Sequence, residues 1–470
     1  MQSVSSTQHK VYSHQSSSVM KCIQRRKIIV VREPGAGKTA ICALTLADLY
    51  KKSVRTVLWI SPAHLINQSI DEVHSWASNL KTFVVTSKHH EIGSCNFISY
   101  SMLRKHSRFI EKCSWDVVVA DEFHRAKNEL TKTHGIMKSL LSNTDRFIGI
   151  TGTPFQNNPY ELFSLVGLLA GKIEQYRLES CLQYRSPRSN LNTRFLMKFG
   201  IRIGGRPNQG PITGVQNPSM MRAILTKYID YRSPESYIDE CSIPVTDEHI
   251  KYVTLTSSEE KLYGRLEKQY RRKNDYMFRT DTLADEYLNN CFNRMHRLRE
   301  FLISHNGILS SKSNAMINHI VEKCKYSKIV VFTNFVELGV DVICKDLDHR
   351  GVKASAYTGK TSKADRERIV SQYQNKDTNV LVVSPVGHEG LNIDGTTEVL
   401  ILDPHYNPER EKQMIARATR ANSSLKSVQV TRYISVRQDE KKSTIDQSIL
   451  RIASRKRKVN SYIESIMSTV

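Results

Sequence analysis

Short runs of β-branched and aliphatic residues recur along the chain, and each one is followed by a polar turn. Runs of this kind are typical of strands that are buried on both faces of a parallel sheet. They occur at Lys27–Val31, Val57–Ile60, Asn96–Ile98, Trp115–Ala120 and Phe147–Ile150, and again at Lys328–Phe332, Ala354–Tyr357, Asn379–Val383 and Val399–Leu402. Segments with helical spacing, such as Ala40–Leu49 and Lys363–Tyr373, lie between them. The pattern predicts an α/β fold with two similar parallel sheets.

The length of 470 residues exceeds the usual size of one hydrophobic core and predicts two or three domains. No apolar run approaches the roughly 20 residues that a membrane span needs, so no membrane association is expected. The 9 cysteines are scattered without a C-x-x-C pair, which argues against a disulfide framework or a zinc ribbon. A reducing, intracellular compartment is expected, and the polar N-terminus lacks the apolar stretch of a secretory signal.

The charge balance narrows the class of partner. Lys and Arg number 69 against 46 Asp and Glu, which gives a formal charge of +23. Such an excess favours a polyanionic partner, because neutralised phosphates release their counterions. Charge alone leaves a merely basic surface as an equal alternative.

A glycine-rich turn follows the first predicted strand and precedes the first predicted helix, which is the context that a phosphate-binding loop requires. The candidate ATP-binding residues in this turn are Pro34, Gly35, Ala36, Gly37, Lys38 and Thr39. Lys38 would meet the β- and γ-phosphates, and Thr39 would hold Mg²⁺. The turn therefore predicts ATP as ligand and Mg²⁺ as cofactor.

Two carboxylates follow the strand Trp115–Ala120. Strand ends are where open α/β sheets place their ligands. Asp121 would hold Mg²⁺ and Glu122 would orient and deprotonate the attacking water, the two tasks that phosphoryl transfer needs. A solvated acidic turn is the alternative, and the upstream phosphate loop argues against it.

A second group of ATP-facing residues lies near the other end of the chain. Gln413, Arg417 and Arg420 fall at i, i+4 and i+7, so on a helix they share one face. The planar, permanently charged arginine fork suits transition-state phosphate oxygens. A basic amphipathic helix is the alternative. The distance along the chain to Lys38 predicts two domains that meet over one ATP.

Polar turns at the ends of the other strands are candidates for contacts with nucleic-acid phosphates or for relaying the nucleotide state, although any one of them is more often only a loop. These candidates are Ser61, Ser99 and Thr153 in the first half and Asn334, Thr358, Ser384 and Gly390 in the second.

Two strings carry a family resemblance. Asp121-Glu122-Phe123-His124-Arg125-Ala126-Lys127-Asn128 resembles the DExHRxKN box of Swi/Snf-type ATPases of helicase superfamily two, and Thr151-Gly152-Thr153-Pro154-Phe155-Gln156-Asn157-Asn158 resembles their TGTPxQN box. Gln15 lies in a segment similar to one whose glutamine reads adenine. Gly390 lies in a segment that resembles the fifth motif, and Gln413, Arg417 and Arg420 match the sixth.

The resemblance implies two RecA-like lobes with helical protrusions inserted between them. The expected divisions are a flexible N-terminus (1–10), a first RecA-like ATP-binding lobe (11–170), helical protrusions and a linker (171–310), a second RecA-like lobe (311–440) and a basic helical tail (441–470). The basic helical pattern of Ser257–Leu302 is read equally well as a brace between domains or as a DNA contact.

The chain also departs from the Swi/Snf pattern. Arg32 and Pro34 stand where that pattern has Asp and Met, and Ala421-Asn422-Ser423 replaces Ile-Gly-Gln. The end of the sixth motif instead resembles nucleic-acid-dependent nucleoside triphosphatases of large DNA viruses, poxvirus type included. A minimal viral branch is therefore an interpretation of these positions.

The resemblance implies a double-stranded-DNA-dependent ATPase that translocates on duplex DNA to remodel DNA–protein complexes or assist transcription. A strand-separating helicase, a viral single-strand-dependent triphosphatase and a non-catalytic ATP switch remain the alternatives. Single-stranded nucleic acid and transcription or chromatin proteins stay open as further partners. The expected compartment is the nucleus or a viral replication or transcription compartment, and the run Arg455–Lys458 is read as a localisation signal, a DNA contact or an ordinary helix end.

Overall fold

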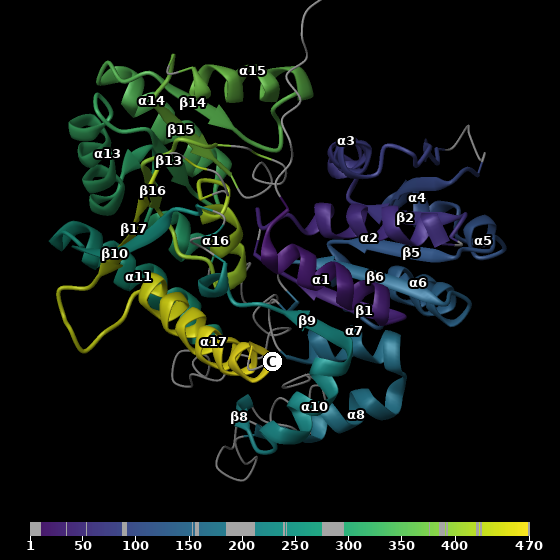
Figure 1. Ribbon diagram of the computed structural model, residues 1–470. Helices are drawn as coiled ribbons and strands as arrows, with labels where there is room; N and C mark the ends of the chain where they lie inside the picture. The colour runs from purple at the N-terminus through teal and green to yellow at the C-terminus, as the bar shows by residue number, and fades with distance from the viewer. Residues whose placement is uncertain are drawn as a thin grey trace, which may run out of the picture.

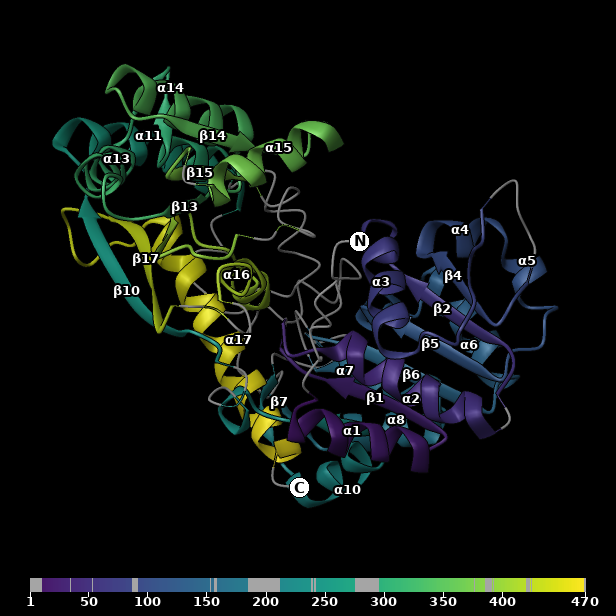
Figure 2. The same cartoon turned by 45° about the horizontal axis from the view of Figure 1, so that its top comes forward.

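The protein, seen in a computed structural model, is organised around two parallel sheets (Figures 1 and 2). The structure describes residues 11–33, 35–52, 54–86, 92–152, 154–155, 159–184, 212–237, 240, 242–274, 296–375, 377–384, 391, 393–419, 423 and 425–468. Both predicted sheets are present, which confirms the α/β class and the two similar lobes.

The first lobe is built on seven strands in the order β3-β4-β2-β5-β6-β1-β9. Every pairing in this sheet is parallel. The strands are β1 (Lys27–Val31), β2 (Val57–Ser61), β3 (Thr82–Val84), β4 (Cys95–Ser99), β5 (Val117–Asp121), β6 (Arg146–Thr151) and β9 (Ile229–Tyr231). The carboxyl ends of β1 and β5 therefore meet at one edge, which places the phosphate loop beside Asp121 and Glu122.

Helices cover both faces of the first sheet. One face packs against α1 (Ser13–Gln24), α2 (Lys38–Lys52) and α3 (Ile66–Trp76). The other face packs against α4 (Tyr100–Lys105), α5 (Ser107–Ile110), α6 (Lys132–Ser142), α7 (Tyr160–Ala170), α8 (Lys172–Ser180) and α10 (Pro218–Tyr228). Burial on both faces explains why its central strands read as continuous apolar runs.

The second lobe has six strands in the order β10-β17-β16-β13-β15-β14, again all parallel. They are β10 (Val245–Thr254), β13 (Ile329–Phe332), β14 (Ala354–Tyr357), β15 (Val380–Val383), β16 (Glu398–Ile401) and β17 (Ser427–Val436). Its faces are covered by α13 (Ser311–Lys323) and α14 (Val342–His349) on one side and by α15 (Lys363–Gln374) and α16 (Pro408–Ile415) on the other.

The segment 171–310, which the sequence assigns to protrusions and a linker, also supplies strands to both sheets. β9 pairs with β1 and extends the first sheet, while β10 pairs with β17 and extends the second. The rest of the described segment contains α8, α10, α11 (Ser257–Asn274) and the short antiparallel pairs β7 (Leu182–Tyr184) with β8 (Ile212–Val215) and β11 (Ser304–His305) with β12 (Ile308–Leu309). The segment is therefore not only helical protrusion and linker.

The tail forms one long helix, α17 (Ile445–Ser468), which contacts both lobes. Ile445 and Ile449 pack with Leu255 and Tyr263 beside the second sheet. At its other end, Ile463, Ile466 and Met467 are part of the hydrophobic core of the first lobe. Both ribbon views show α17 running from beside β17 to α10 (Figures 1 and 2).

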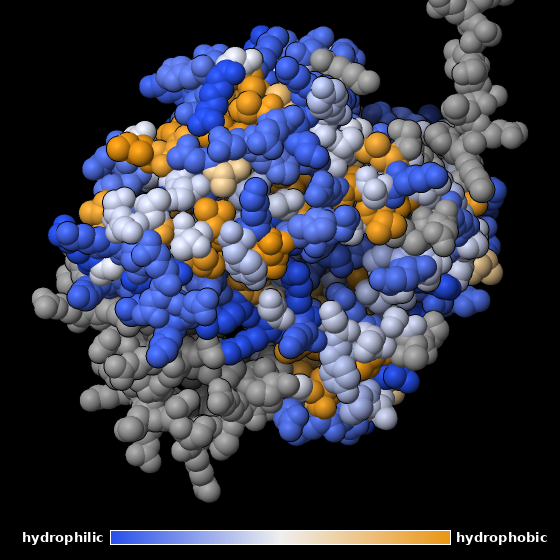
Figure 3. Space-filling view, turned by 90° about the vertical axis from the view of Figure 1, so that its left-hand side faces the viewer, coloured by the Kyte–Doolittle hydropathy of each residue, from blue (hydrophilic) through white to orange (hydrophobic). Residues whose placement is uncertain are grey.

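The surface of the second-lobe side is largely hydrophilic, and its hydrophobic residues gather only in small separate patches (Figure 3). Within the described residues, no helix combines the length and the apolar character that crossing a membrane requires.

Candidate active site

The phosphate loop lies between the end of β1 and the start of α2, as its motif predicts. Gly35 and Gly37 have φ angles of 87° and 70°, in the left-handed region that glycine tolerates best. A Cβ atom at Gly37 would overlap the side-chain amide of Gln15. Gly37 is thus required both by its backbone conformation and by the close approach of α1.

Gln15 is buried against this loop instead of lying on the surface. Its Oε1 accepts a hydrogen bond from the backbone N–H of Tyr12 at 3.0 Å, and only 4% of the residue is exposed. The neighbouring His14 ring lies with Nε2 3.2 Å from the carbonyl oxygen of Ala36, so α1 contacts the loop twice. Adenine recognition by Gln15 stays a prediction that this position supports.

Lys38 begins α2 and turns back over its own loop. Its Nζ donates to the carbonyl oxygens of Arg32 at 3.1 Å and Glu33 at 3.0 Å. Burial lowers the pKa of Lys38, and the nearby charges of Glu122 and Asp121 oppose that shift. An ammonium group held by two weak carbonyl acceptors is available to move to a stronger, charged phosphate acceptor.

Asp121 and Glu122 lie at the end of β5, where backbone contacts hold them. The Tyr100 hydroxyl donates to the carbonyl oxygen of Asp121 at 2.7 Å, and Ser61 Oγ donates to Asp121 Oδ2 at 3.3 Å. Glu122 has a φ angle of 49°, which is unfavourable for a residue with a side chain. Strain of this kind is found where a side chain must be aimed at a reaction centre.

Burial, followed by the adjacent carboxylate of Glu122, raises the pKa of Asp121. Burial would also raise the pKa of Glu122, but the hydrogen bond and charge of His124, then Lys38 and Arg417, outweigh it and lower that pKa. The two neighbouring carboxyl groups are thereby separated in acidity, which leaves Glu122 ionised and able to accept a proton.

His124 connects Glu122 to the end of β6. Its Nδ1 lies 3.2 Å from Glu122 Oε2 and 3.0 Å from the hydroxyl oxygen of Thr151. Thr151 ends β6 and is the first residue of the second family string, so one imidazole joins the two strings. The DExH pattern includes this histidine. Its contact with Thr151 does not follow from the pattern, because it depends on the pairing of β5 with β6.

The second lobe brings Arg417 to this site. Arg417 is near enough for its charge to help lower the pKa of both Lys38 and Glu122 in the first lobe. The expectation of one helix face is not met, because α16 ends at Ile415 and Arg417 lies in the turn after it, with its N–H donating to Met414 at 3.1 Å. Gln413 is on α16 itself.

The residues proposed to bind Mg²⁺ suit that ion. Thr39 follows Lys38 at the start of α2, and Asp121 is a buried carboxylate beside a second carboxylate. Mg²⁺ is usually bound by one or two protein oxygens together with substrate phosphates and water, so a larger cluster of carboxylates is not needed. When bound, the ion would neutralise phosphate charge, and Thr39 and Asp121 would hold it.

Arg32, which departs from the family pattern, is buried by an ion pair that the sequence does not reveal. Its guanidinium lies 2.6 Å from Asp230 Oδ2, and both side chains have an exposed fraction of 0%. Asp230 also accepts hydrogen bonds from Ser18 Oγ and Lys21 Nζ. This network connects the end of β1 with β9 and α1, next to the phosphate loop.

The candidate nucleic-acid residues occupy the expected strand ends, and their contacts with nucleic acid stay predictions. Ser61 is buried against Asp121, and Ser99 caps α4 by accepting from Met102 N–H at 3.2 Å. Asn334 donates its backbone N–H to Asp403 at 3.0 Å. Thr358 and Ser384 are buried at the ends of β14 and β15. The remaining predicted site residues, Pro34, Thr153, Gly390 and Arg420, lie outside the described residues.

Asp403 also pairs with Arg299, whose guanidinium lies 2.9 Å from Asp403 Oδ2 with 6% of its side chain exposed. This contact attaches Arg299 to the segment that follows β16 of the second sheet, and the choice between a brace and a DNA contact stays a prediction.

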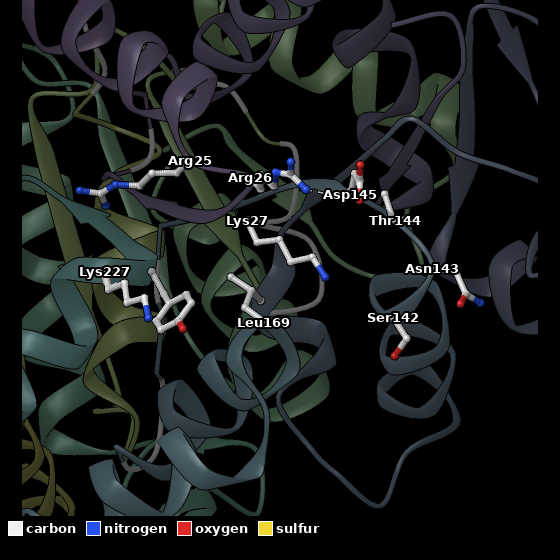
Figure 4. Close-up of a pocket in the computed structure, with 10 residues that line it drawn as sticks. Arg25, Arg26, Lys27, Ser142, Asn143, Thr144, Asp145, Leu169 and Lys227 are labelled. Atoms are coloured by element: carbon white, nitrogen blue, oxygen red, sulfur yellow. Dashed lines mark ion pairs between the residues drawn. The ribbon is translucent and has the colours of Figure 1, made fainter.

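A basic hollow of about 620 Å³ lies at the opposite, amino-terminal end of β1 (Figure 4). Two of its cations are bound to helix ends. Arg25 donates to the carbonyl oxygen of Thr226 at 2.9 Å, and Lys27 donates to that of Leu141 at 2.5 Å. Cations at such carbonyl-rich helix ends stabilise the fold, which gives Arg25 and Lys27 a structural role.

Two family models match consecutive parts of the chain. Residues 12–306 match the SNF2-related domain, and residues 311–422 match the helicase conserved C-terminal domain.

Several characterised proteins are similar to the chain at low identity. It is 21% identical to the ISWI chromatin-remodeling complex ATPase ISW1 of Saccharomyces cerevisiae, over 97% of this chain and 40% of that protein. It is 23% identical to a RAD54-like DNA repair and recombination protein of Gallus gallus, over 94% of this chain and 65% of that protein. The chain thus spans less than two thirds of these relatives. A solved SWI2/SNF2 ATPase core of Sulfolobus solfataricus in complex with duplex DNA is 19% identical, covers 98% of this chain and 94% of its own, and has a TM-score of 0.43.

Proposed function

Because the chain belongs to the SNF2-related family, we propose that it is a DNA-dependent ATPase and translocase that moves on duplex DNA to remodel DNA–protein complexes or assist transcription. The observation that carries the proposal is the joint presence of Lys38, Glu122 and Arg417 at one site drawn from two lobes. A protein that used ATP only as a structural switch would need no aligned base and arginine.

Each residue has a distinct task in hydrolysis. Lys38 leaves its two backbone carbonyls and binds the phosphates, while the amides of Gly35 and Gly37 approach the same oxygens. Glu122 accepts the proton of the attacking water, because His124 holds it ionised and aimed. Arg417 neutralises the charge that develops on the transferred phosphoryl group.

The two-lobe arrangement supports movement coupled to hydrolysis. Arg417 belongs to the second lobe and Lys38 to the first, so ATP between them favours closure and its hydrolysis favours opening. The formal charge of +23 favours a polyanion, and the names of similar proteins refer to chromatin remodeling and DNA repair. Duplex DNA is the proposed track, with single-stranded nucleic acid as the second candidate.

The test is the steady-state rate of ATP hydrolysis with no nucleic acid, with duplex DNA, with single-stranded DNA and with RNA. Duplex DNA is expected to stimulate the rate most, and Glu122→Gln is expected to lower the hydrolysis rate by about 10²-fold or more. A preference for single strands or RNA would instead favour the viral triphosphatase or helicase alternative. No hydrolysis under any condition would leave the ATP switch.

Translocation is measured separately, by the displacement of a third DNA strand that is bound to the duplex as a triplex. The proposed compartment, the nucleus or a viral replication or transcription compartment, is tested by imaging a fluorescent fusion beside a variant with Arg455–Lys458 replaced by alanine.

A further inference from the structure

An ion pair joins the phosphate loop of the first lobe to the helix that precedes Arg417 in the second. Lys412 Nζ on α16 lies 2.5 Å from Glu33 Oε1. Glu33 directly precedes the glycine-rich turn, and Lys412 directly precedes Gln413. The pair therefore crosses between the lobes beside the ATP site. Glu33 stands between Arg32 and Pro34, the two positions at which the loop departs from the Swi/Snf pattern.

Glu33 is fixed relative to the loop. Its backbone N–H donates to the Tyr237 hydroxyl at 3.1 Å, and its carbonyl oxygen accepts from Lys38 at 3.0 Å. Tyr237 is itself buried and stacks on the His14 ring with centroids 4.7 Å apart. The backbone of Glu33 is thus held in place beside the loop, which reduces the entropy that its side chain loses when it binds a cation.

Lys412 faces carboxylates from three separate elements. Burial would lower its pKa, but Glu33, then Glu409 on α16 and Glu464 on α17 outweigh that effect and raise it. Glu409 is buried and accepts from Asn460 Nδ2 of α17 at 3.3 Å. Lys412 is the cation paired with Glu33, so its removal would leave the Glu33 carboxylate of the first lobe facing the Glu409 carboxylate of the second across the ATP site.

Lys412 and Arg417 are mechanically connected. The Lys412 carbonyl accepts from Ala416 N–H at 2.9 Å, and the Arg417 N–H donates to the Met414 carbonyl at 3.1 Å. A shift of Lys412 relative to the phosphate loop therefore carries Arg417 with it.

We propose that Glu33 and Lys412 form an electrostatic latch that holds the second lobe where Arg417 faces Lys38 and Glu122, and that both are positioning residues for hydrolysis. The inference rests on the proposed ATPase function. Lys412 holds the end of α16 close to the phosphate loop, and Glu464 links this contact to the tail helix. Loss of the latch leaves the nucleotide-binding loop intact but lowers the fraction of molecules in the closed arrangement.

The test compares Lys412→Met, Lys412→Arg, Glu33→Gln and the Lys412→Met/Glu33→Gln double variant. We expect kcat to fall about tenfold in Lys412→Met and Glu33→Gln, and no further in the double variant, because both changes break the same contact. KM for ATP in Lys412→Met should rise by less than kcat falls, since the phosphate loop is unchanged and only the closure that ATP favours is weakened. Lys412→Arg should restore most of kcat.

Lys360→Met is the matched control, because Lys360 forms an exposed, 3.5 Å pair with Glu337 in the same lobe. It should behave as wild type. Thermal unfolding of each variant shows whether a loss of kcat reflects a loss of fold.

Small-angle X-ray scattering provides a readout that does not require hydrolysis. Lys412→Met should have a larger radius of gyration than wild type at low salt, and high salt should enlarge wild type toward the same value. A wild-type kcat in Lys412→Met, additive losses in the double variant, or unchanged scattering would each overturn the latch. If wild type hydrolyses no ATP, the proposed function fails, and the scattering comparison still decides on the latch.

Discussion

Arg32 and Asp230 form an ion pair of 2.6 Å in which neither side chain is exposed to solvent. Arg32 directly follows β1, Asp230 lies within the neighbouring strand β9, and Asp230 accepts further hydrogen bonds from Ser18 and Lys21 of α1. Arg32 also donates to the backbone carbonyl oxygens of Val31 and Asp230 at 2.7 Å. A buried pair with this many partners specifies where β9 and α1 sit under the phosphate loop.

Breaking the Arg32–Asp230 pair is expected to destabilise the first lobe strongly. Arg32→Met leaves the carboxylate of Asp230 buried with Lys21 as its remaining cation, and Asp230→Asn leaves the guanidinium buried without a counter-charge. Each change should lower the free energy of unfolding by about 3–5 kcal/mol, measured by urea denaturation. Arg26→Met, which removes an exposed 3.9 Å contact with Asp145, is the control and should cost under about 1 kcal/mol. A small decrease in the free energy of unfolding in both Arg32→Met and Asp230→Asn would contradict the structural role assigned to the pair.

Gly37→Ala is expected to abolish ATP binding, because the new Cβ meets Gln15 and the φ angle of 70° disfavours any side chain. Isothermal titration with a non-hydrolysable ATP analogue should show at least a tenfold weaker Kd. Removing the collision with Gln15→Ala should not restore binding, since the backbone strain remains. Gly135→Ala, in α6 with open space around it, is the control and should bind as wild type does.

Thr151→Val should change the pH dependence of hydrolysis. Without the hydroxyl that holds the His124 ring, the hydrogen bond and charge that lower the pKa of Glu122 weaken. The carboxylate then protonates at higher pH, so the rising limb of the kcat–pH profile should move upward, measured by steady-state assays over a series of buffers. Thr144→Val removes a buried hydroxyl that bonds only Leu140 within its own helix end, and its profile should match wild type. Identical kcat–pH profiles for both variants would rule out a role of Thr151 in holding His124 against Glu122.

The docking of the tail helix should weaken as pH rises through neutrality. Burial and the nearby charges of Glu409, Glu33 and Glu235 raise the pKa of Glu464 to about 7, although the charge of Lys412 opposes this shift. An unfolded glutamate titrates near about 4.3, so the folded protein binds this proton more tightly. The resulting stability is fully present below about pH 4.3 and is lost as pH rises through about 7.

Tm should therefore fall between pH 6 and pH 8 by an amount on the order of 2 °C, and Glu464→Gln should reduce the fall. Scanning calorimetry at the two pH values measures it. An equal fall in the variant would assign the pH dependence to other groups.

The sequence predicts what is encoded locally and fails where a contact joins distant segments. β1, the phosphate loop and β5 are readable because continuous burial and a spaced motif coincide in a few residues. β9 has three residues and β10 is mostly exposed, so neither gives a buried-strand pattern. Arg32–Asp230 and Glu33–Lys412 join residues far apart in the chain, and neither member of a pair is informative alone. The placement of Arg417 after the end of α16 depends on where that helix stops, which periodicity does not determine.

Because Ile463, Ile466 and Met467 are part of the hydrophobic core of the first lobe, that lobe depends on residues that are synthesised only after the whole of the second lobe. A domain emerging from the ribosome normally folds as soon as its own segment is available. Here the amino-terminal lobe must wait, with part of its apolar surface uncovered, until translation has passed the whole of the second lobe. A nascent chain that stalls before residue 463 would thus be a substrate for chaperones and proteases, however well its first 250 residues could form their sheet.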